Sequence, residues 1–289
     1  MTAPYTLNVK GHLLTLDYPR VMGILNVTPD SFFAGSRTQT EQAIAQRVRQ
    51  IVAEGGTIID IGACSTRPDS QPVSEQEEMD RLRMALPIVT AELSESSEFS
   101  ENSEHSPLSL SVDTFRPDVA RMAVEEFGAD IINDVSEGCP TMFRMAARLA
   151  KPYILTSVQP DLRSTLLTCA DKVQQLRDLG QNDIIIDPGF GFGKTLEQNF
   201  ALMNELEKLH VLDLPLLVGI SRKSMIYKTL DCTPDEALNG TITLNTIALM
   251  KGASILRVHD VKAAADCIAI TSHLSPLTSQ FSSCSSNSD

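Results

Sequence analysis

Polar residues follow several short apolar runs of this chain, and one group of them suits a flat heterocycle. Asp113, Asn133 and Asp187 supply carboxylate and amide atoms that can pair with a ring rich in N–H donors, such as an amino-pyrimidinone edge. Lys223 lies in the loop after the next apolar run and can meet a carbonyl or ring nitrogen of the same heterocycle. These four residues predict a site for a planar, nitrogen-rich ring.

A second group has the character of an anion site. Arg257 and His259 are two residues apart on an expected strand, so their side chains leave the same face. Asn26 ends the first expected strand, which a closed barrel would place beside the last one. We therefore expect these three residues to hold a diphosphate and its Mg²⁺, with Asn26 as a metal ligand.

Each of these residues also has an ordinary structural explanation when it is taken singly. Asn26 or Asp113 could cap a helix, and Asp187-Pro-Gly could be only a turn. Polar residues at the ends of nearly all expected strands are harder to attribute to turn chemistry. Their recurrence favours one common pocket.

The glycine-rich stretch 187–195 fits neither of the common nucleotide motifs. Pro188 occupies a position where a P-loop requires glycine, and Lys194 stands where the Rossmann pattern requires its third glycine. We expect a turn that lets the backbone approach a planar ligand, with Phe190 either as a stacking wall or as ordinary packing. Cys64 has no His beside it, and the five His residues form no H-x-x-x-H pair, so neither a cysteine nucleophile nor a zinc site is expected.

The elements that must position these residues repeat one unit: a short β-branched run, a polar loop and a segment with helical periodicity. Eight such units predict an α/β fold, the TIM (β/α)8 barrel, whose active site lies at the carboxyl ends of its strands. Residues 5–17 are expected to form a hairpin that caps the other end. Helix starts are signalled at Ser74-Glu-Gln-Glu77 and Thr233-Pro-Asp-Glu236. The expected strands are 21–27, 57–61, 108–112, 130–135, 152–156, 184–187, 216–220 and 254–258.

The chain length and charge limit the possible classes of protein. The chain has 289 residues and a net charge of −13, which argues against binding of nucleic acid or an anionic membrane. Residues 92–107 carry much of the acidity and predict a surface insertion on the helix-to-strand side of the barrel, away from the site. Residues 275–289 predict a disordered serine-rich tail, which leaves a single domain over 1–274.

Cellular location follows from what the sequence lacks. No apolar run is long enough for a membrane span, and the amino terminus does not have the order of a signal peptide. The six cysteines are scattered without a C-x-x-C pair. We expect a cytoplasmic protein with reduced thiols and small-molecule substrates.

Taken together and in this order, the motifs resemble those of the dihydropteroate synthases, a family of pterin-binding enzymes. The resemblance extends from about residue 20 to about residue 270. The matching segments are 22–32 (MGILNVTPDSF), 60–62 (DIG), 65–68 (STRP), 111–114 (SVDT), 132–135 (INDV), 187–194 (DPGFGFGK), 219–224 (GISRKS) and 257–260 (RVHD).

The resemblance implies a TIM barrel, usually a homodimer, that acts in folate biosynthesis and is inhibited by sulfonamides. The implied reaction condenses 6-hydroxymethyl-7,8-dihydropterin diphosphate with 4-aminobenzoate to give 7,8-dihydropteroate and diphosphate, with Mg²⁺ as cofactor. It implies mobile loops at 27–38 and 63–72. By position, the resemblance implies that the pterin binds to Asp113, Asn133, Asp187 and Lys223, and that the diphosphate binds to Asn26, Arg257 and His259. It implies that 4-aminobenzoate binds to Thr66, Arg67 and Ser224. The implied catalytic residues are Asn26, Arg67, Lys223, Arg257 and His259.

The chain departs from the family pattern in two places. Cys64 and Asp69 stand where Glu and Gly are common, and residues 155–158 read LTSV where a Met-His-Met segment is frequent. Two other functions remain open: a pterin-binding methyltransferase domain that passes methyl groups from a folate to a corrinoid protein, and a barrel that binds pterin without catalysis. The first has no use for the anion site of Arg257 and His259. For the synthase we expect SN1-like substitution without an obligatory general base.

Overall fold

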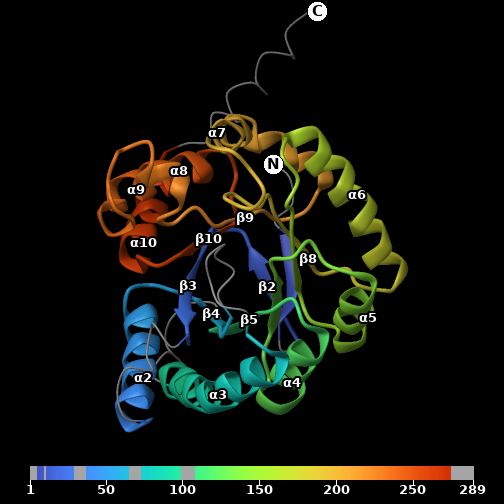
Figure 1. Cartoon of the computed structure of the whole chain (residues 1–289), viewed down its shortest axis with the longest axis vertical. Coiled ribbons are helices and arrows are strands. Elements are labelled where there is room, and N and C mark those ends of the chain that lie inside the picture. The colour runs from blue at the N-terminus through green and yellow to red at the C-terminus, as the bar shows by residue number, and fades with distance from the viewer. Residues whose placement is uncertain (1–4, 10, 29–36, 65–72, 99–107, 275–289) are drawn as a thin grey trace, which may run out of the picture.

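Eight parallel strands form a central sheet that helices surround (Figure 1). The computed structural model describes residues 5–9, 11–28, 37–64, 73–98 and 108–274. Each expected strand overlaps a strand of the structure, although β9 has only two residues. The strands are β3 (Arg20–Asn26), β4 (Ile58–Gly62), β5 (Ser109–Asp113), β6 (Ile131–Asp134), β7 (Tyr153–Thr156), β8 (Ile184–Asp187), β9 (Leu217–Val218) and β10 (Ile255–Val258).

The sheet closes on itself into a nearly complete barrel. Its order is β8-β7-β6-β5-β4-β3-β10-β9, and every neighbouring pair is parallel. The two edges meet where Ile186 of β8 forms a parallel bridge with Leu216, directly before β9. Strands from the two ends of the chain, β3 and β10, therefore lie side by side, and the predicted TIM barrel is confirmed.

Helices follow the strands and cover the outside of the barrel (Figure 1). Both predicted helix starts are present: Ser74 Oγ accepts a hydrogen bond from Glu77 N at 3.2 Å, and Thr233 forms a capping box with Glu236. None of the described helices has the length and apolar character needed to cross a membrane. The helices are α2 (Arg37–Ala53), α3 (Glu75–Glu98), α4 (Pro117–Phe127), α5 (Pro140–Leu149), α6 (Leu162–Asp178), α7 (Leu196–Asn204), α8 (Ser224–Tyr227), α9 (Leu238–Met250) and α10 (Val261–Ser272), with short 3₁₀ helices η1 (Leu206–Leu212) and η2 (Pro234–Glu236).

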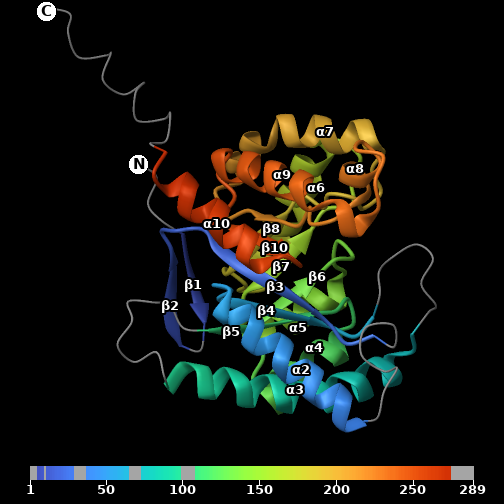
Figure 2. The same ribbon diagram turned by 90° about the vertical axis from the view of Figure 1, so that its left-hand side faces the viewer.

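The amino-terminal hairpin closes one end of the barrel, as predicted (Figure 2). It consists of β1 (Tyr5–Val9) and β2 (His12–Leu16), which pair antiparallel. Because this end is filled by apolar side chains, the opposite end, where the strands finish, is left for polar chemistry. The apolar cluster joins Leu7, Val9, Leu14 and Leu16 to Met22, Ile58, Ile131, Ile154, Ile185, Leu217 and Ile255 from the first residues of the strands.

The acidic insertion begins later than the sequence predicts, because residues 92–98 are the last turns of α3. Glu92 accepts two hydrogen bonds from Arg49 of α2, each at 2.6 Å, and Leu93 is buried in the core. This ion pair and this apolar contact stabilise a segment that composition alone marks as unfavourable for order. Residues 99–107 and 275–289 lie outside the described residues, so the remainder of the insertion and the tail stay predictions.

Candidate active site

A buried carboxylate, Asp60 of β4, connects several strands near the open end of the barrel. Its Oδ2 atom accepts hydrogen bonds from Arg257 Nε at 2.6 Å and from Asn133 Nδ2 at 3.0 Å. Its Oδ1 atom accepts one from Ser111 Oγ at 2.6 Å. Since Asp60, Ser111 and Asn133 are all fully buried, this network fixes the positions of Arg257 and Asn133.

Arg257 also pairs with Asp113, a residue of the predicted pterin set. Its Nη2 atom donates to Asp113 Oδ2 at 2.6 Å. Burial alone would lower the pKa of Arg257, but Asp60 and Asp113 together raise it, so the guanidinium stays charged. Burial raises the pKa of Asp113 to about 7, with Arg257 opposing the rise and Asp60 adding to it. Near neutral pH the Asp113 carboxyl can therefore donate or accept a hydrogen bond.

Asn133 presents an unpaired acceptor beside this network. Its Oδ1 atom is buried and has no hydrogen-bond partner among the described residues. Asn133 and Asp113 are neighbours in the parallel register of β6 and β5, so their side chains leave the same face of the sheet. An unpaired buried carbonyl costs about 1–3 kcal/mol. An N–H group of a bound ring would remove that cost.

Asp187 and Lys223 complete the predicted pterin set. Asp187 ends β8, and its Oδ1 atom accepts a hydrogen bond from Gly189 N at 2.8 Å. Lys223 donates to the carbonyl oxygen of Phe190 and lies with Nζ 4.3 Å from the centre of the Phe192 ring. Burial lowers the pKa of Lys223 to about 8 against the opposing effect of Asp187, and burial raises the pKa of Asp187 against the opposing effect of Lys223.

The glycine-rich stretch is a compact turn, as expected from a sequence that fits neither nucleotide-binding motif. Gly189 has φ 71°, and a Cβ there would lie 1.8 Å from the carbonyl oxygen of Ser157, so only glycine fits. Lys194 Nζ donates to the carbonyl oxygens of Ser157, Gly189 and Phe192 at 3.2, 3.0 and 3.2 Å. Phe190 is fully buried, which favours the packing explanation for that ring.

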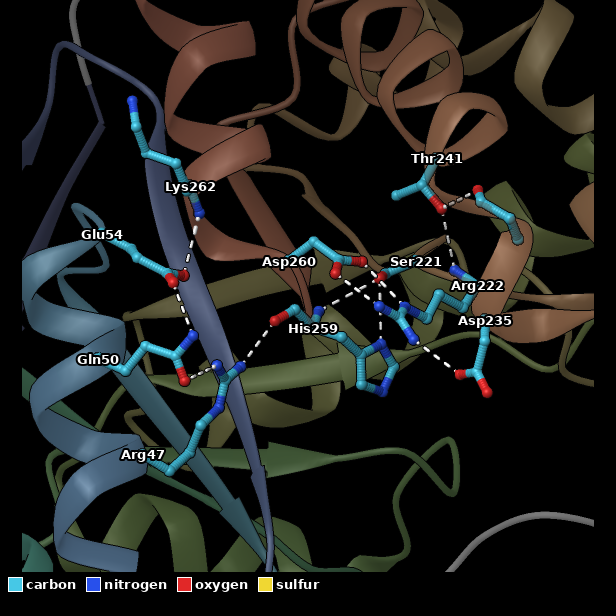
Figure 3. A network of polar contacts seen from close by, with 11 residues as sticks. Arg47, Gln50, Glu54, Ser221, Arg222, Asp235, Thr241, His259, Asp260 and Lys262 are labelled. Atoms are coloured by element: carbon cyan, nitrogen blue, oxygen red, sulfur yellow. Dashed lines mark hydrogen bonds and ion pairs between the residues drawn. The ribbon is translucent and has the colours of Figure 1, made fainter. Parts of the chain in front are cut away.

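Two members of the predicted anion set, Asn26 and His259, line an open cavity of about 690 Å³, whose other walls come largely from α2 and α10 and include Arg47, Glu54 and Lys262. Asn26 ends β3, and His259 follows β10 directly before α10. Ser221 Oγ lies 3.0 Å from His259 Nδ1 and accepts a hydrogen bond from His259 N at 3.2 Å (Figure 3). The third member, Arg257, does not line this cavity; its described contacts connect it to the pterin set instead.

The remaining predicted residues concern 4-aminobenzoate. Ser224 is the first residue of α8, next to Lys223. Thr66 and Arg67 lie outside the described residues, as does Asp69. Burial raises the pKa of the Cys64 thiol, which agrees with the expectation that this cysteine is not a nucleophile.

Sequence reasoning assigned no role to two residues that organise the site. Asp60 could have been found, because a carboxylate inside the apolar run Ile58–Gly62 needs buried partners. Ser221 lies in a motif of the resemblance, but its contact with His259 depends on a loop path that no local pattern predicts. No group of three or more metal-ligating His, Cys, Asp or Glu side chains occurs within the described ranges.

Comparison with known proteins identifies the family of the chain. The profile of a family described as pterin binding enzyme matches residues 22–259. A dihydropteroate synthase of Streptococcus pyogenes serotype M3 is 40% identical over 266 residues, covering 88% of this chain and 95% of that one. The dihydropteroate synthase of Escherichia coli K12 is 36% identical over 282 residues, covering 91% and 94%.

Solved structures give the same result. The dihydropteroate synthase of Xanthomonas albilineans with 4-aminobenzoic acid superposes with a TM-score of 0.82 at 34% identity, covering 94% of this chain and 98% of that one. The Yersinia pestis dihydropteroate synthase in a sulfonamide drug complex superposes with a TM-score of 0.76 at 36% identity, covering 93% and 99%.

A parallel barrel with acceptors and cations gathered at its strand ends, and with this family match, defines a pterin-binding enzyme. The relatives identify the kind of pterin-binding enzyme more closely, because this chain shares sequence and fold with dihydropteroate synthases over most of their length. The chain belongs to the dihydropteroate synthase family.

Proposed function

We propose that this site condenses 6-hydroxymethyl-7,8-dihydropterin diphosphate with 4-aminobenzoate and releases diphosphate, a step of folate biosynthesis. The observation that carries the proposal is the unpaired, buried Oδ1 atom of Asn133 beside the Asp60–Arg257–Asp113 network. A pterin edge offers the N–H donors that such an acceptor lacks.

The pterin ring would lie among Asp113, Asn133, Asp187 and Lys223. The two carboxylates and the amide oxygen accept hydrogen bonds from ring N–H groups, and the Lys223 ammonium donates to a ring carbonyl or nitrogen. Arg257 pairs with Asp113 and in this proposal extends toward the diphosphate. The carboxylates also favour positive charge on the ring.

The diphosphate would lie at the cavity of Asn26 and His259. Asn26 fits a Mg²⁺ site of the substrate-assisted kind, since Mg²⁺ usually takes few protein ligands and completes its shell with phosphate oxygens and water. The lack of an all-protein ligand cluster among the described residues is compatible with such a site. When bound, Mg²⁺ would neutralise charge on the leaving diphosphate. His259 would add a hydrogen bond to the diphosphate, and the Arg257 guanidinium would contribute positive charge from the neighbouring network with Asp60 and Asp113.

The chemistry would be a dissociative substitution. The bond between the pterin methylene carbon and the diphosphate oxygen breaks, and its electron pair leaves with the diphosphate. The electron-rich dihydropterin spreads the resulting positive charge, which Asp113 and Asp187 stabilise. The amine nitrogen of 4-aminobenzoate then bonds to the methylene carbon and loses a proton to water. No side chain is required as a general base.

The 4-aminobenzoate would meet Ser224, Thr66 and Arg67. The Xanthomonas albilineans relative was solved with 4-aminobenzoic acid and the Yersinia pestis relative with a sulfonamide drug. These ligands support a shared subsite here, at which sulfonamides compete with the amine. The loops predicted at 27–38 and 63–72 lie largely outside the described residues.

The proposal extends to a cytoplasmic homodimer. Apolar side chains on neighbouring helices α9 and α10 are exposed, among them Ile247, Met250 and Ile270. An exposed apolar surface of this kind is typical of a subunit interface. Light scattering should give twice the mass of the chain, and Ile270→Glu should reduce it to a monomer; a monomeric unaltered protein would contradict the dimer.

One assay tests the function. The purified chain should release diphosphate from the pterin diphosphate only when 4-aminobenzoate and Mg²⁺ are both present. A folate–corrinoid methyltransferase or a barrel that only binds pterin would release none. Substituted anilines test the mechanism: a strong dependence of the rate on amine nucleophilicity would contradict dissociative substitution.

A further inference from the structure

The turn that carries His259 is held on both sides by polar contacts (Figure 3). On one side, Ser221 Oγ contacts both the backbone N–H and the Nδ1 atom of His259. On the other side, Arg47 Nη2 of α2 donates to the carbonyl oxygen of His259 at 2.6 Å. The main chain of His259 is therefore fixed at both its donor and its acceptor.

Arg47 belongs to a polar row on α2. Its Nη1 atom donates to Gln50 Oε1 at 3.1 Å, and Gln50 Nε2 donates to Glu54 Oε1 at 2.7 Å. Glu54 Oε2 accepts a hydrogen bond from the backbone N–H of Lys262, in the first turn of α10, at 3.3 Å. The spacing of three and four residues places these side chains on one helix face. The row connects α2 to both ends of the turn 259–262 (Figure 3).

The side of the turn that faces α8 is held by Arg222. This residue has φ 55°, in the left-handed region that costs a side-chain-bearing residue free energy. Its guanidinium donates to both carboxylate oxygens of Asp260 at 2.9 and 2.7 Å and to Asp235 at 3.0 Å. These bonds hold the strained backbone that presents Ser221 to His259. The turn that Arg47 contacts on one side is therefore held on its other side by the ion pairs of Arg222.

We propose that Arg47 is a positioning residue for the diphosphate, acting through the carbonyl oxygen of His259. The inference rests on the proposed function, because it assumes that His259 binds that group. Arg47 lines the same cavity as Asn26 and His259, but its described hydrogen bonds go to neutral oxygens of His259 and Gln50, so we assign it the role of orienting the turn. Without it, the turn is free to move away from Asn26, which lies across the same cavity.

Ser221 and Arg47 together orient His259. Ser221 Oγ contacts Nδ1 of the imidazole and so orients the ring, while Arg47 holds the carbonyl side of the same residue. When Ser221 donates to Nδ1, a neutral imidazole carries its proton on Nε2.

The test measures the affinity of the whole chain for two probes by calorimetry. The probes are pyrophosphate with Mg²⁺, and 6-hydroxymethylpterin, which lacks a diphosphate. Arg47→Met should weaken pyrophosphate binding about tenfold, as is usual when a supporting hydrogen bond to a binding group is lost, and should leave pterin affinity unchanged. In steady-state assays the KM for the pterin diphosphate should rise while the KM for 4-aminobenzoate stays the same.

Arg49→Met is the matched control. Arg49 lies on the same helix, and its guanidinium pairs with Glu92, away from the cavity. This variant also loses one positive charge and one set of hydrogen bonds, so it should lower thermal stability without changing pyrophosphate affinity. An equal loss of pyrophosphate affinity in Arg49→Met would mean that charge alone is responsible, which overturns the proposal.

A double-mutant cycle with His259→Gln separates the indirect role from direct contact. If Arg47 acts through His259, Arg47→Met should change pyrophosphate affinity less than twofold in the His259→Gln background; titration followed by ³¹P NMR gives the constants if binding is weak. A tenfold loss in that background, or unchanged affinity in the single variant, would overturn the proposal. Failure of the proposed function would look different: the unaltered chain would bind neither probe.

Discussion

Arg257 Nε lies 2.6 Å from Asp60 Oδ2, although the two residues are 197 positions apart in the chain. The same carboxylate oxygen accepts from Asn133 Nδ2, so one buried group orients a cation and an amide at once. Asp60 is covered by these partners and is not expected to touch a ligand. It orients two residues of the proposed pterin site, Arg257 and Asn133, from behind.

Replacing Asp60 with Asn tests this relationship. The variant keeps the side-chain shape but leaves Arg257 with a single carboxylate partner. Breaking a buried ion pair typically lowers the free energy of unfolding by about 3–5 kcal/mol. Pterin affinity should also fall, because Asn133 and Arg257 lose the carboxylate that orients them. Urea unfolding and calorimetry measure the two effects. Ser111→Ala is the control: it removes one hydrogen bond to the same carboxylate and should cost about 1 kcal/mol. Equal losses in both variants would contradict the ion-pair argument.

The pKa of Asp113 predicts how stability depends on pH. Because burial raises this pKa to about 7, the favourable contribution of the protonated carboxyl is complete below the unfolded pKa of about 4 and is lost as pH rises through about 7. Asp113→Asn cannot ionise, so its stability relative to the unaltered protein should increase by about 2–4 kcal/mol between pH 4 and pH 8. A constant difference for Asp113→Asn would refute the prediction.

The pKa of Lys223 predicts how ligand binding depends on pH. Burial lowers it to about 8, so the ammonium proposed to donate to the pterin is lost as pH rises through that value. Pterin affinity, followed by fluorescence from pH 6.5 to 9.5, should fall above pH 8. Lys223→Arg stays charged throughout, and the ratio of the two affinities cancels any titration of the pterin itself. A ratio that does not change with pH would show that the charge of Lys223 is not needed.

Gly189 allows a test of the turn beside Asp187. Gly189→Ala would place a Cβ against the carbonyl oxygen of Ser157, so we expect a loss of about 4 kcal/mol in unfolding free energy together with impaired pterin binding. Gly180 is the matched control, because it also has a positive φ but no atom within 4 Å of an added Cβ. Gly180→Ala should cost only the backbone strain of about 1–2 kcal/mol. Similar losses for the two variants would show that the collision is relieved elsewhere.

The barrel could be predicted because the local sequence marks where each strand begins and ends. The run Ile184–Asp187 is apolar and β-branched up to a turn signal, and the observed β8 has the same limits. The end of α3 could not be predicted in this way. Residues 92–98 read as an acidic linker, and their order depends on Arg49 of another helix. The composition of a segment gives no information about ion-pair partners on other helices.

The sequence predicts candidate site residues more readily than it predicts the contacts between them. Strand periodicity places Arg257 on a face, but it does not say that the guanidinium pairs with Asp60 and Asp113. Arg47 gives no signal at all in the sequence, since it lies on an outer helix 212 positions before His259. Contacts of this kind depend on barrel closure, which brings β10 against β3.

Barrel closure also sets an order for synthesis of the chain. Asp60 and Asp113 leave the ribosome long before Arg257, whose strand β10 is the last of the sheet. Until that strand is added, both carboxylates lack their counter-charge and β3 has an unpaired edge. A chain interrupted before β10 would contain the residues of most helices and strands, but the proposed pterin pocket would lack Arg257, so a pterin could not stabilise that chain against degradation. The ligand can thus protect only finished molecules.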